Sequence, residues 1–552
     1  MKPVFRSIFF PILIPAFLII AGAAVAQETN YPTKSIERYY DLSLTEAERD
    51  SMQSNLDDNR DKYKEIHAFL LDNSTGTSLL FNPYPPGFKG DSVQYPIDWA
   101  LPKQVGLPAT GEGIAFLPVH ELAVLLETRK VTSTELTKLY IERLKKYGDT
   151  LQCVITILET QALEQAKKAD EEIGSGEYKG PLHGIPYGIK DLLAVKGTKT
   201  TWGAMPYKDQ VIDETATVVE KLDRAGAILV VKLTMGALAM GDIWYGGVTK
   251  NPWNLREGSS GSSAGSAAAT AAGLVGFAIG TETWGSIVSP STRCGTTGLR
   301  PTFGLVSRHG AMALSWSMDK IGPICRSALD CALVFEVIRG PDGKDQSVRD
   351  APFNYNARAD IRNLKVGYVK DLFDRDTVNR ARNQQVLDRI TGLGIKLVDV
   401  KLPEDIPVSA LSIILGSEAA AAFDELTRSG RDSLLVNQRK RAWPNYFRSA
   451  RFIPAVEYVN ATRIRQILIR EYNERTKDFD AIVVPTYAGD QLLMTNLTGH
   501  PCLVLPNGFN EAGSPTSITF LGKLQGEAGL IAVGRAVQET TTWEDIHPPL
   551  FR

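Results

Sequence analysis

The chain has 552 residues, 43% of them hydrophobic and 22% charged, a balance typical of a globular protein with a large core. Its formal net charge is −2, so no basic excess points to a nucleic acid or an anionic membrane as partner. The composition therefore favours a protein that acts on a small molecule.

Residues 1–26 have the pattern of an export signal. A basic start precedes an apolar stretch at 8–23, and Ala-Val-Ala precedes Gln27, which matches a signal-peptidase site. The apolar stretch is shorter than the ~20 residues that a membrane span needs, and it contains prolines. We therefore expect cleavage after Ala26 and an exported protein, periplasmic or secreted, without stable membrane insertion. The alternative is an uncleaved membrane anchor.

Residues 27–112 are expected to form an N-terminal extension. A polar stretch at 45–71 favours a helix, and Asn-Pro-Tyr-Pro-Pro-Gly at 82–87 favours an extended, turn-rich wrap. Asn-Ser-Thr at 73–75 has the pattern of a glycosylation acceptor, but we interpret it as a polar loop without assigned function.

Residues 113–552 are expected to form one α/β catalytic domain. Thr132 and Glu135 have the spacing of a capping box, which predicts a helix that ends near Gly148. A second helix carries alanines at helical spacing before Gly174. Both helices place small or apolar side chains on one face, and we interpret these positions as structural.

Helices then alternate with apolar strands. The segment at 216–224 favours a helix, and strands are predicted at 227–231, 364–369, 395–400, 481–485 and 502–506. This alternation predicts a large mixed, mostly parallel central sheet covered by helices on both faces.

The segment Gly-Ser-Ser-Gly-Ser-Ser-Ala-Gly-Ser at 258–266, called the Gly/Ser loop, is followed by an alanine-rich run. We expect a buried helix at about 264–278. Its N-terminus would face the Gly/Ser loop, where free N–H groups favour developing negative charge.

Three motifs together resemble the amidase signature family. Gly-Ile-Pro-Tyr-Gly-Ile-Lys-Asp lies at 184–191, the Gly/Ser loop follows, and Gly-Thr-Glu-Thr-Trp-Gly-Ser-Ile-Val-Ser-Pro lies at 280–290. The resemblance extends over about residues 118–545 and includes further motifs at 251–254, 298–302, 304, 307–308, 319–323 and 496–499.

The resemblance implies the amidase signature fold and a catalytic relay of three residues. Ser286 is expected to be the nucleophile, Ser262 to follow a cis peptide and pass on its proton, and Lys190 to be the final base. Lys190 must start neutral, so burial has to lower its pKa from its usual value of ~10.4. We expect activity that increases with pH, and we predict no cofactor.

The resemblance also implies an oxyanion hole. Its donors are expected to be the backbone N–H groups of Thr283, Trp284, Gly285 and Ser286, because a turn that contains glycine can direct successive amides at one oxygen. Ser263 is expected to support the site through hydrogen bonds.

Two residues depart from the family pattern, in which an acidic residue and any residue precede Gly-Gly-Ser-Ile-Arg. This chain has Trp284 at the first glycine and Val288 at the arginine. The indole could narrow or cover the acyl pocket, and the missing arginine removes an expected partner of Glu282. We therefore expect a different support network around Glu282, which is predicted to have a supporting role.

Other nucleophiles are weaker hypotheses. Gly-Ser-Ser-Ala-Gly at 261–265 would make Ser263 the nucleophile of an α/β-hydrolase, with His500 or His547 as base, but residues 252–258 do not have the pattern of a buried strand. Ser-x-x-Lys at 317–320 lacks the accompanying Lys-Thr-Gly.

The cysteines predict no metal site, because no two have Cys-x-x-Cys spacing and none lies in a His-rich stretch. Their odd number leaves at least one thiol free. We interpret most of them as buried apolar side chains: Cys153, Cys294, Cys325, Cys331 and Cys502.

The sequence thus predicts an exported amidase that hydrolyses a carboxylic amide to a carboxylate and ammonia or an amine. Family substrates range from aliphatic amides to tRNA-linked glutamine, and the export signal argues against the tRNA role. The alternative from a different class is a non-catalytic exported binding protein on the same scaffold, with Trp284 blocking the site. The presence of Lys190, Ser262 and Ser286 together argues against that alternative.

Overall fold

The computed structural model describes residues 32–68 and 71–552, so the export signal predicted at 1–26 lies outside the described residues. The chain divides into two compact units, Met1–Leu70 and Leu71–Arg552. Within the described ranges, no helix combines the length and the apolar character that crossing a membrane requires.

The first unit contains the helix α1 (Glu46–Ala68), as expected from the polar stretch at 45–71, after two short 3-10 helices, η1 (Pro32–Ser35) and η2 (Glu37–Tyr39). Arg49 of α1 donates to Glu37 at 2.7 Å. This ion pair joins the 3-10 helices to α1.

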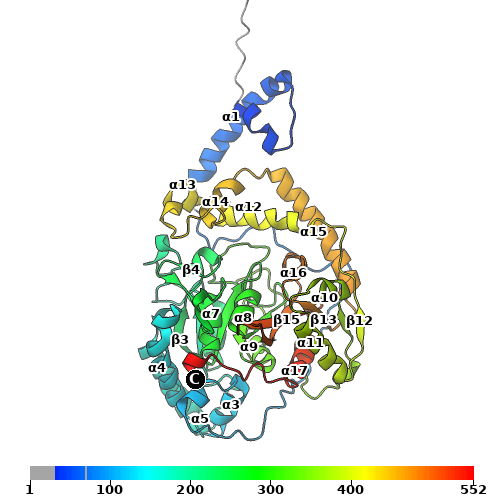
Figure 1. Cartoon of the computed structure of the whole chain (residues 1–552). Helices are drawn as coiled ribbons and strands as arrows, with labels where there is room; N and C mark the ends of the chain where they lie inside the picture. Colours follow the sequence, from blue (N-terminus) through cyan, green and yellow to red (C-terminus); the bar gives the residue numbers. More distant parts are fainter. Residues whose placement is uncertain (1–31, 69–70) are drawn as a thin grey trace, which may run out of the picture. The chain divides into compact units, whose positions relative to one another are not determined.

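The second unit is built on an eleven-stranded sheet with the order β1-β3-β2-β8-β10-β9-β14-β15-β13-β11-β12. Figure 1 shows β3 toward one side of this unit and β12 toward the other. The strands are β1 (Val154–Ile157), β2 (Pro186–Lys190), β3 (Ile228–Leu233), β8 (Phe277–Glu282), β9 (Thr297–Arg300), β10 (Lys320–Cys325), β11 (Val366–Tyr368), β12 (Leu397–Asp399), β13 (Ala481–Pro485), β14 (Cys502–Phe509) and β15 (Pro515–Leu521). Two separate ribbons pair β4 (Ile243–Trp244) with β5 (Gly247–Val248), and β6 (Lys250–Asn251) with β7 (Asn254–Gly258).

The sheet is mixed, as predicted, but it is not mostly parallel. Among the described strands, pairing is parallel only at β2–β3, β2–β8, β11–β12 and β11–β13. The central strands β8, β10, β9, β14, β15 and β13 pair antiparallel in that order. Parallel neighbours need crossover connections, which occur toward the two ends of the sheet. The antiparallel middle instead contains chain reversals such as the β14–β15 hairpin.

All five predicted strands are present, as β3, β11, β12, β13 and β14. The helix expected at 264–278 is too long in the prediction, because α7 ends at Ala271 and β8 begins at Phe277. Gly273 has a φ of +64°, a left-handed conformation that ends the helix and turns the chain toward the sheet.

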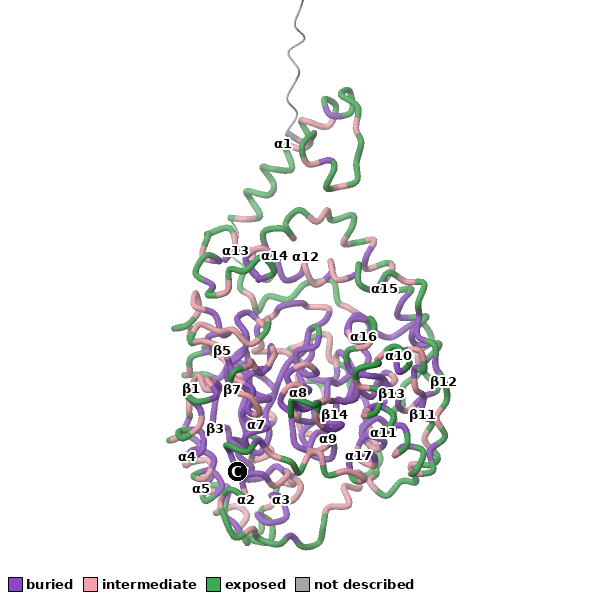
Figure 2. Tube along the Cα trace, in the orientation of Figure 1, coloured by how far each residue is buried: buried purple, intermediate pink, exposed green. Residues whose placement is uncertain are grey.

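Helices cover both faces of the sheet, as predicted. Phe277 and Ile279 belong to the hydrophobic cluster that contains α9 and α17, whereas Ala278 between them belongs to the cluster of α7, because successive strand residues point to opposite faces. Figure 2 shows the buried residues concentrated along the strands and in α7. The helices are α2 (Gly111–Ala115), α3 (Val119–Glu127), α4 (Ser133–Leu151), α5 (Glu159–Ser175), α6 (Thr217–Arg224), α7 (Ala264–Ala271), α8 (Val288–Cys294), α9 (Ala328–Ile338), α10 (Lys370–Arg375), α11 (Arg380–Gly392), α12 (Ile413–Ala422), α13 (Asp424–Arg428), α14 (Trp443–Ala450), α15 (Ala455–Thr476), α16 (Gln491–Thr498) and α17 (Glu527–Gln538).

Local sequence signals explain the helix ends near the site. The capping box of Thr132 and Glu135 is present at the start of α4. That helix continues past Gly148 to Leu151 and ends at Gln152, which has the left-handed conformation.

All five cysteines are buried and free. This agrees with the interpretation of most of them as buried apolar side chains.

Residues 71–112, which we assigned to the N-terminal extension, lie in the second compact unit. The boundary at residue 112 stays a prediction.

Candidate active site

Lys190 is the last residue of β2, at the end where the parallel strands β2 and β8 both finish. Ile189 pairs with Ile279, so the Lys190 side chain emerges beside the last residues of β8. The carboxyl ends of parallel strands are a common position for functional side chains. The sheet thus sets the distance between Lys190 and the segment that carries Ser286.

The ammonium group of Lys190 lies in a cage of hydroxyl and carbonyl oxygens. Its Nζ is 2.7 Å from Ser262 Oγ, 3.1 Å from Ser263 Oγ and 2.8 Å from Thr281 Oγ1. The carbonyl of Thr281 is 3.4 Å away. The side chain is fully buried, and no carboxylate of the described residues contacts it directly.

Burial lowers the pKa of Lys190 from its ordinary value of 10.5 to about 7, against the opposing fields of Asp319 and Glu282. A substantial fraction of this lysine is therefore neutral near neutral pH. A neutral Nζ at 2.7 Å from Ser262 Oγ can accept the hydroxyl proton of that serine.

Ser262 lies in the Gly/Ser loop and follows a cis peptide bond from Gly261. A Cβ on Gly261 would lie 1.8 Å from the carbonyl oxygen of Gly241, so only glycine fits against that segment. The Ser262 carbonyl accepts from the N–H of Gly236 at 3.3 Å. The loop thus lies tightly against the segment at 236–241.

Ser286 lies in a turn between β8 and α8. Gly285 before it has a φ of +83°, which a residue with a side chain rarely adopts. The Ser286 carbonyl accepts from Ser263 N–H at 3.2 Å, which ties the turn to the Gly/Ser loop. In the described ranges, the Ser286 hydroxyl makes no hydrogen bond, so the link from Ser286 to Ser262 is not closed in this structure. Such contacts are often long before substrate binds.

The four N–H groups predicted to form the oxyanion hole have no acceptor among the described residues. They belong to Thr283, Trp284, Gly285 and Ser286, whereas the next two N–H groups, of Ile287 and Val288, donate to Glu282 Oε2 at 2.8 and 3.0 Å. The turn therefore presents unused donors at its beginning and is fixed at its end.

Glu282 is fully buried, and Arg300 of β9 neutralises it. Arg300 Nη1 donates to Glu282 Oε1 at 2.7 Å, and the Asn496 side chain donates to the same oxygen at 2.8 Å. Burial by itself raises the pKa of Glu282, but Arg300 and the hydrogen bonds from Val288 and Asn496 lower it to about 2. Arg300 thus supplies the positive charge that Val288 cannot.

Trp284 lies partly at the surface. Its side chain is 46% exposed, and it is not among the residues that line the cavity beside Thr281.

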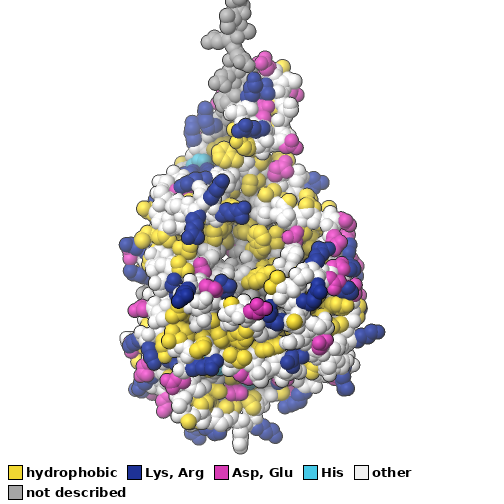
Figure 3. Space-filling model, in the orientation of Figure 1, with side chains coloured by type: hydrophobic (Ala, Val, Ile, Leu, Met, Phe, Trp, Pro, Cys, Tyr) yellow, Lys and Arg dark blue, Asp and Glu magenta, His cyan; other side chains and the backbone are white. Residues whose placement is uncertain are grey.

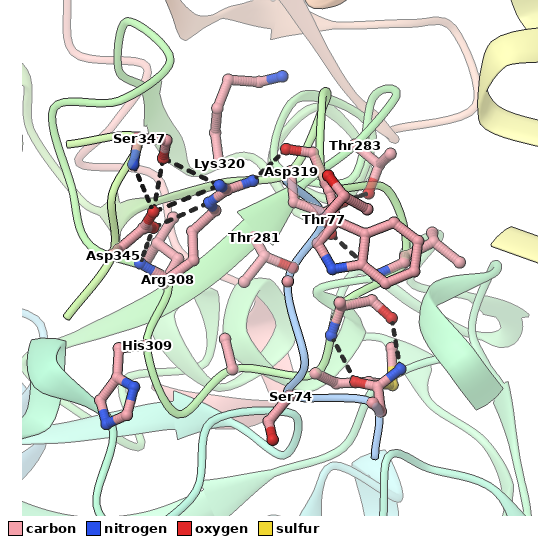
Figure 4. Close-up of a pocket in the computed structure, with 18 of the residues that line it drawn as sticks. Ser74, Thr77, Thr281, Thr283, Arg308, His309, Asp319, Lys320, Asp345 and Ser347 are labelled. Carbon is pink, nitrogen blue, oxygen red and sulfur yellow. Dashed lines mark hydrogen bonds and ion pairs between the residues drawn. The ribbon is translucent and has the colours of Figure 1, made fainter. Parts of the chain in front are cut away.

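A cavity of about 280 Å³ adjoins the site (Figure 4). Thr281, which contacts Lys190, and Thr283 of the predicted oxyanion turn both line it, whereas Ser286 itself does not. Thr283 Oγ1 donates to Asp319 at 2.6 Å. In the orientation of Figure 1, the surface is hollowed below α12 and α14, with hydrophobic side chains around the hollow (Figure 3).

The structure gives Ser263 a different environment from that of a nucleophile. Its hydroxyl donates to Thr281 O at 3.0 Å and accepts from Thr281 N–H and Lys190. The strand before the Gly/Ser loop is β7, which is not fully buried and lies outside the main sheet. His500 contacts Thr498, and His547 stacks on Phe116 at 4.1 Å.

Three contributors to the site were missed from the sequence. Arg300 and Asn496 lie in the motifs at 298–302 and 496–499, but no local pattern indicates that both contact Glu282. Thr281 was not singled out, although its hydroxyl contacts Lys190. It lies in the motif at 280–290, five residues before Ser286 and near the end of an apolar strand.

Comparisons with known proteins show the family of this chain. The family model described as Amidase matches residues 135–531. A glutamyl-tRNA(Gln) amidotransferase subunit from Moorella thermoacetica is 31% identical over 482 residues, which cover 79% of this chain and 99% of the relative.

Solved structures of amidases have the same fold. An amidase family protein from Bacillus anthracis aligns with a TM-score of 0.70 and 26% identity, over 80% of this chain and 95% of that one. The peptide amidase from Stenotrophomonas maltophilia aligns with a TM-score of 0.68 and 27% identity, over 77% of this chain and 96% of that one. This protein is therefore a member of the amidase signature family, whose enzymes act on C–N bonds.

Proposed function

We propose that this protein is an exported amidase that hydrolyses the C–N bond of a small carboxylic amide through an acyl-enzyme on Ser286. The observation that carries the proposal is the buried Lys190, whose pKa is lowered to about 7 and whose Nζ lies 2.7 Å from Ser262 Oγ. A lysine that is easily neutral and faces a serine hydroxyl is suited to be the base of a proton relay.

In the proposed first half-reaction, Ser286 Oγ attacks the carbonyl carbon of the amide. Its proton passes to Ser262, whose own hydroxyl proton passes to Lys190. The developing oxyanion accepts hydrogen bonds from N–H groups of the turn at 283–286. When the C–N bond breaks, the proton returns from Lys190 through Ser262 to the leaving nitrogen, which departs as ammonia or an amine.

In the second half-reaction, a water molecule replaces the amine. It gives its proton to the same relay and attacks the acyl-enzyme, and the returning proton restores the Ser286 hydroxyl. The carboxylic acid product ionises, and the released ammonia or amine takes up its proton, so the relay ends the cycle with the protons that it held at the start. The residues need no cofactor for these steps.

Export is part of the proposal and rests on the sequence at 1–26. It favours a free-standing amidase over the role of the glutamyl-tRNA(Gln) amidotransferases to which the chain is similar, because tRNA is a cytoplasmic substrate. N-terminal sequencing of protein recovered after cell fractionation tests this part. The expected mature chain begins at Gln27 and is found outside the cytoplasm, whereas a full-length chain in the cytoplasm contradicts it.

A panel of small amides tests the activity. Purified mature protein is incubated with acetamide, hexanamide, benzamide and an amidated dipeptide, and the release of ammonia is measured. We expect hydrolysis of at least one amide by the wild type and none by the Ser286→Ala variant. A folded wild type that hydrolyses no amide, even in a wider screen, would favour the non-catalytic binding protein instead.

A further inference from the structure

One wall of the cavity beside Thr281 comes from a segment outside the part of the chain that the family model matches. Residues 73–81, called the strap, precede that match, which begins at residue 135. The strap lies in the same compact unit as the candidate site. Figure 4 shows Ser74 and Thr77 of the strap in the same pocket as Thr281 and Thr283.

The strap is anchored at both ends. At its start, the Asn73 side chain donates to Ala313 O at 3.0 Å and accepts from Ala313 N–H at 2.8 Å, as a neighbouring strand would. The same amide donates to Ala422 O at 3.3 Å. This contact occupies the nitrogen that glycosylation would modify. At the other end, the Phe81 ring meets Phe303 edge-on at 4.9 Å.

Four of the charged groups that line the cavity already have partners in the protein: Arg308, Asp319, Lys320 and Asp345. Arg308 pairs with Asp345 at 3.1 Å, and Asp319 accepts from Thr283. Lys320 donates to the carbonyl of Met318, and burial holds its pKa well below its ordinary value. A charged substrate group would therefore enter without a free counterion.

The polar groups His309 and Lys344, which also line the cavity, have partners too. His309 faces Glu214 and Lys344 faces Glu220, each at 3.4 Å. What the cavity leaves for a ligand is mainly apolar surface, from Leu192, Met312, Leu314, Trp316 and Ile321.

Leu79 and Leu80 of the strap add to this apolar surface. They are 81% and 53% exposed, so they contribute little to the packed core, yet both line the cavity. Small-molecule sites combine such apolar walls with a few polar groups at the reacting end, as Thr281 and Thr283 do here.

We propose that the strap is a specificity element, and that Leu79 and Leu80 hold an uncharged, apolar substituent of the amide substrate in the cavity. This inference rests on the proposed function, because it places the cavity beside the reacting amide. The volume of about 280 Å³ fits a phenyl ring or a short alkyl chain. Amides with charged substituents are expected to be poor substrates.

The test compares the wild type with the double variant Leu79→Ser, Leu80→Ser on two series of amides. One series lengthens the acyl group from acetamide to octanamide, and the other lengthens the N-alkyl group of acetamides. For the series whose variable group enters the cavity, we expect the variant to lose about tenfold in kcat/KM at six or eight carbons, mainly through KM. For acetamide itself, we expect less than about a twofold change.

Val378→Ser is the matched control, because Val378 is an equally exposed apolar residue that lines no part of the cavity. We expect this control to behave as the wild type in both series. Asn73→Ala, which releases the start of the strap, is expected to reproduce the loss for long substituents. If the double variant lowers all amides equally, or lowers neither series, the strap does not select substrates.

A binding measurement separates this inference from the proposed activity. Octanamide and N-octylacetamide are titrated by calorimetry into the Ser286→Ala variant with and without the two serine substitutions in the strap. Weaker binding only with the altered strap supports the inference, even if no amide were hydrolysed. Binding of both ligands that ignores the strap, or no binding of either, overturns it.

Discussion

The two ends of the proposed relay are built differently. Lys190 is enclosed by contacts to Ser262, Ser263 and Thr281, and its side chain is fully buried. The end of the turn that carries Ser286 is held by hydrogen bonds to Glu282. The N–H groups at 283–286 and the serine hydroxyl have no partner among the described residues. The base end is complete without substrate, whereas the nucleophile end leaves its donors free for one. Breaking each end separately tests this contrast.

The largest effect is expected at the nucleophile. Ser286→Ala should reduce kcat by about 10⁴-fold or more, because no other hydroxyl stands in the turn at the same place. The thermal unfolding midpoint should not change, since the Ser286 hydroxyl makes no hydrogen bond within the described chain. Steady-state kinetics and thermal melts check both statements. Retention of more than a hundredth of the activity would assign the nucleophile elsewhere.

At the base end, Lys190→Met keeps the length of the side chain and removes the nitrogen. We expect kcat to fall about 10³-fold, within the usual range for loss of a general base. Unlike Ser286→Ala, this variant should also lower stability at pH 9.5, where Lys190 is neutral in the folded chain, because the oxygens of Ser262 and Thr281 lose a buried partner. Near-wild-type kcat with lowered stability would make Lys190 purely structural.

The pH dependence of kcat tests the role of Lys190 without a mutation. Only the neutral amine can accept a proton, and burial lowers its pKa to about 7, so kcat should increase through that pH and level off above it. Between the plateau and pH 5, we expect a decrease of about 100-fold. A rate that is flat over this interval would contradict a titrating lysine base.

The same lowered pKa predicts a trend in stability. Between pH of about 7 and 10.5, the unfolded chain holds the Lys190 proton more tightly than the folded chain. The contribution of this group to the free energy of unfolding should therefore increase as pH increases through that window. Urea titrations of the wild type and Lys190→Met, compared at pH 7 and 9.5, measure the contribution.

Removing the Glu282 carboxylate, which holds the end of the turn, should reduce activity less than the changes at Ser286 and Lys190. Glu282→Gln leaves the Arg300 guanidinium buried without its counterion, which typically costs about 3–5 kcal/mol of stability. We expect kcat to fall about tenfold, because the turn loses its geometry but keeps its nucleophile. Urea unfolding and kinetics measure the two effects. Asn496→Ala, which removes one hydrogen bond to the same oxygen, serves as a milder comparison.

The smallest effect is expected for Trp284→Ala. The indole is 46% exposed and does not line the cavity, so kcat/KM for small amides should stay within about threefold of the wild type. An increase of tenfold or more would mean that the indole blocks the acyl site, as the binding-protein alternative supposes.

Local sequence patterns predicted the features that depend on local signals. The capping box of α4 and the apolar strands β3 and β13 are each encoded by a pattern of a few neighbouring residues. The same is true of the motifs that contain Lys190 and Ser262, whose side chains are in contact. The partner of Glu282 could not be found in this way, because Arg300 reaches it from β9, a strand that is not adjacent to β8.

Strand direction and the strap depend on long-range packing. The antiparallel centre of the sheet needs β14 to pair with β9 across about two hundred residues, for which single strands give no signal. The sequence at 73–75 indicated only a polar loop, and nothing in it showed that Asn73 clamps Ala313 beside the cavity.

The most direct test of the account is mass spectrometry of the mature protein after reaction with a fluorophosphonate probe, which labels an activated serine whatever its substrate. We predict one adduct, on Ser286, that forms faster as pH increases through about 7 and is nearly absent in Lys190→Met. An adduct on Ser263, or no adduct on a folded protein, would contradict the relay from Lys190 through Ser262 to Ser286.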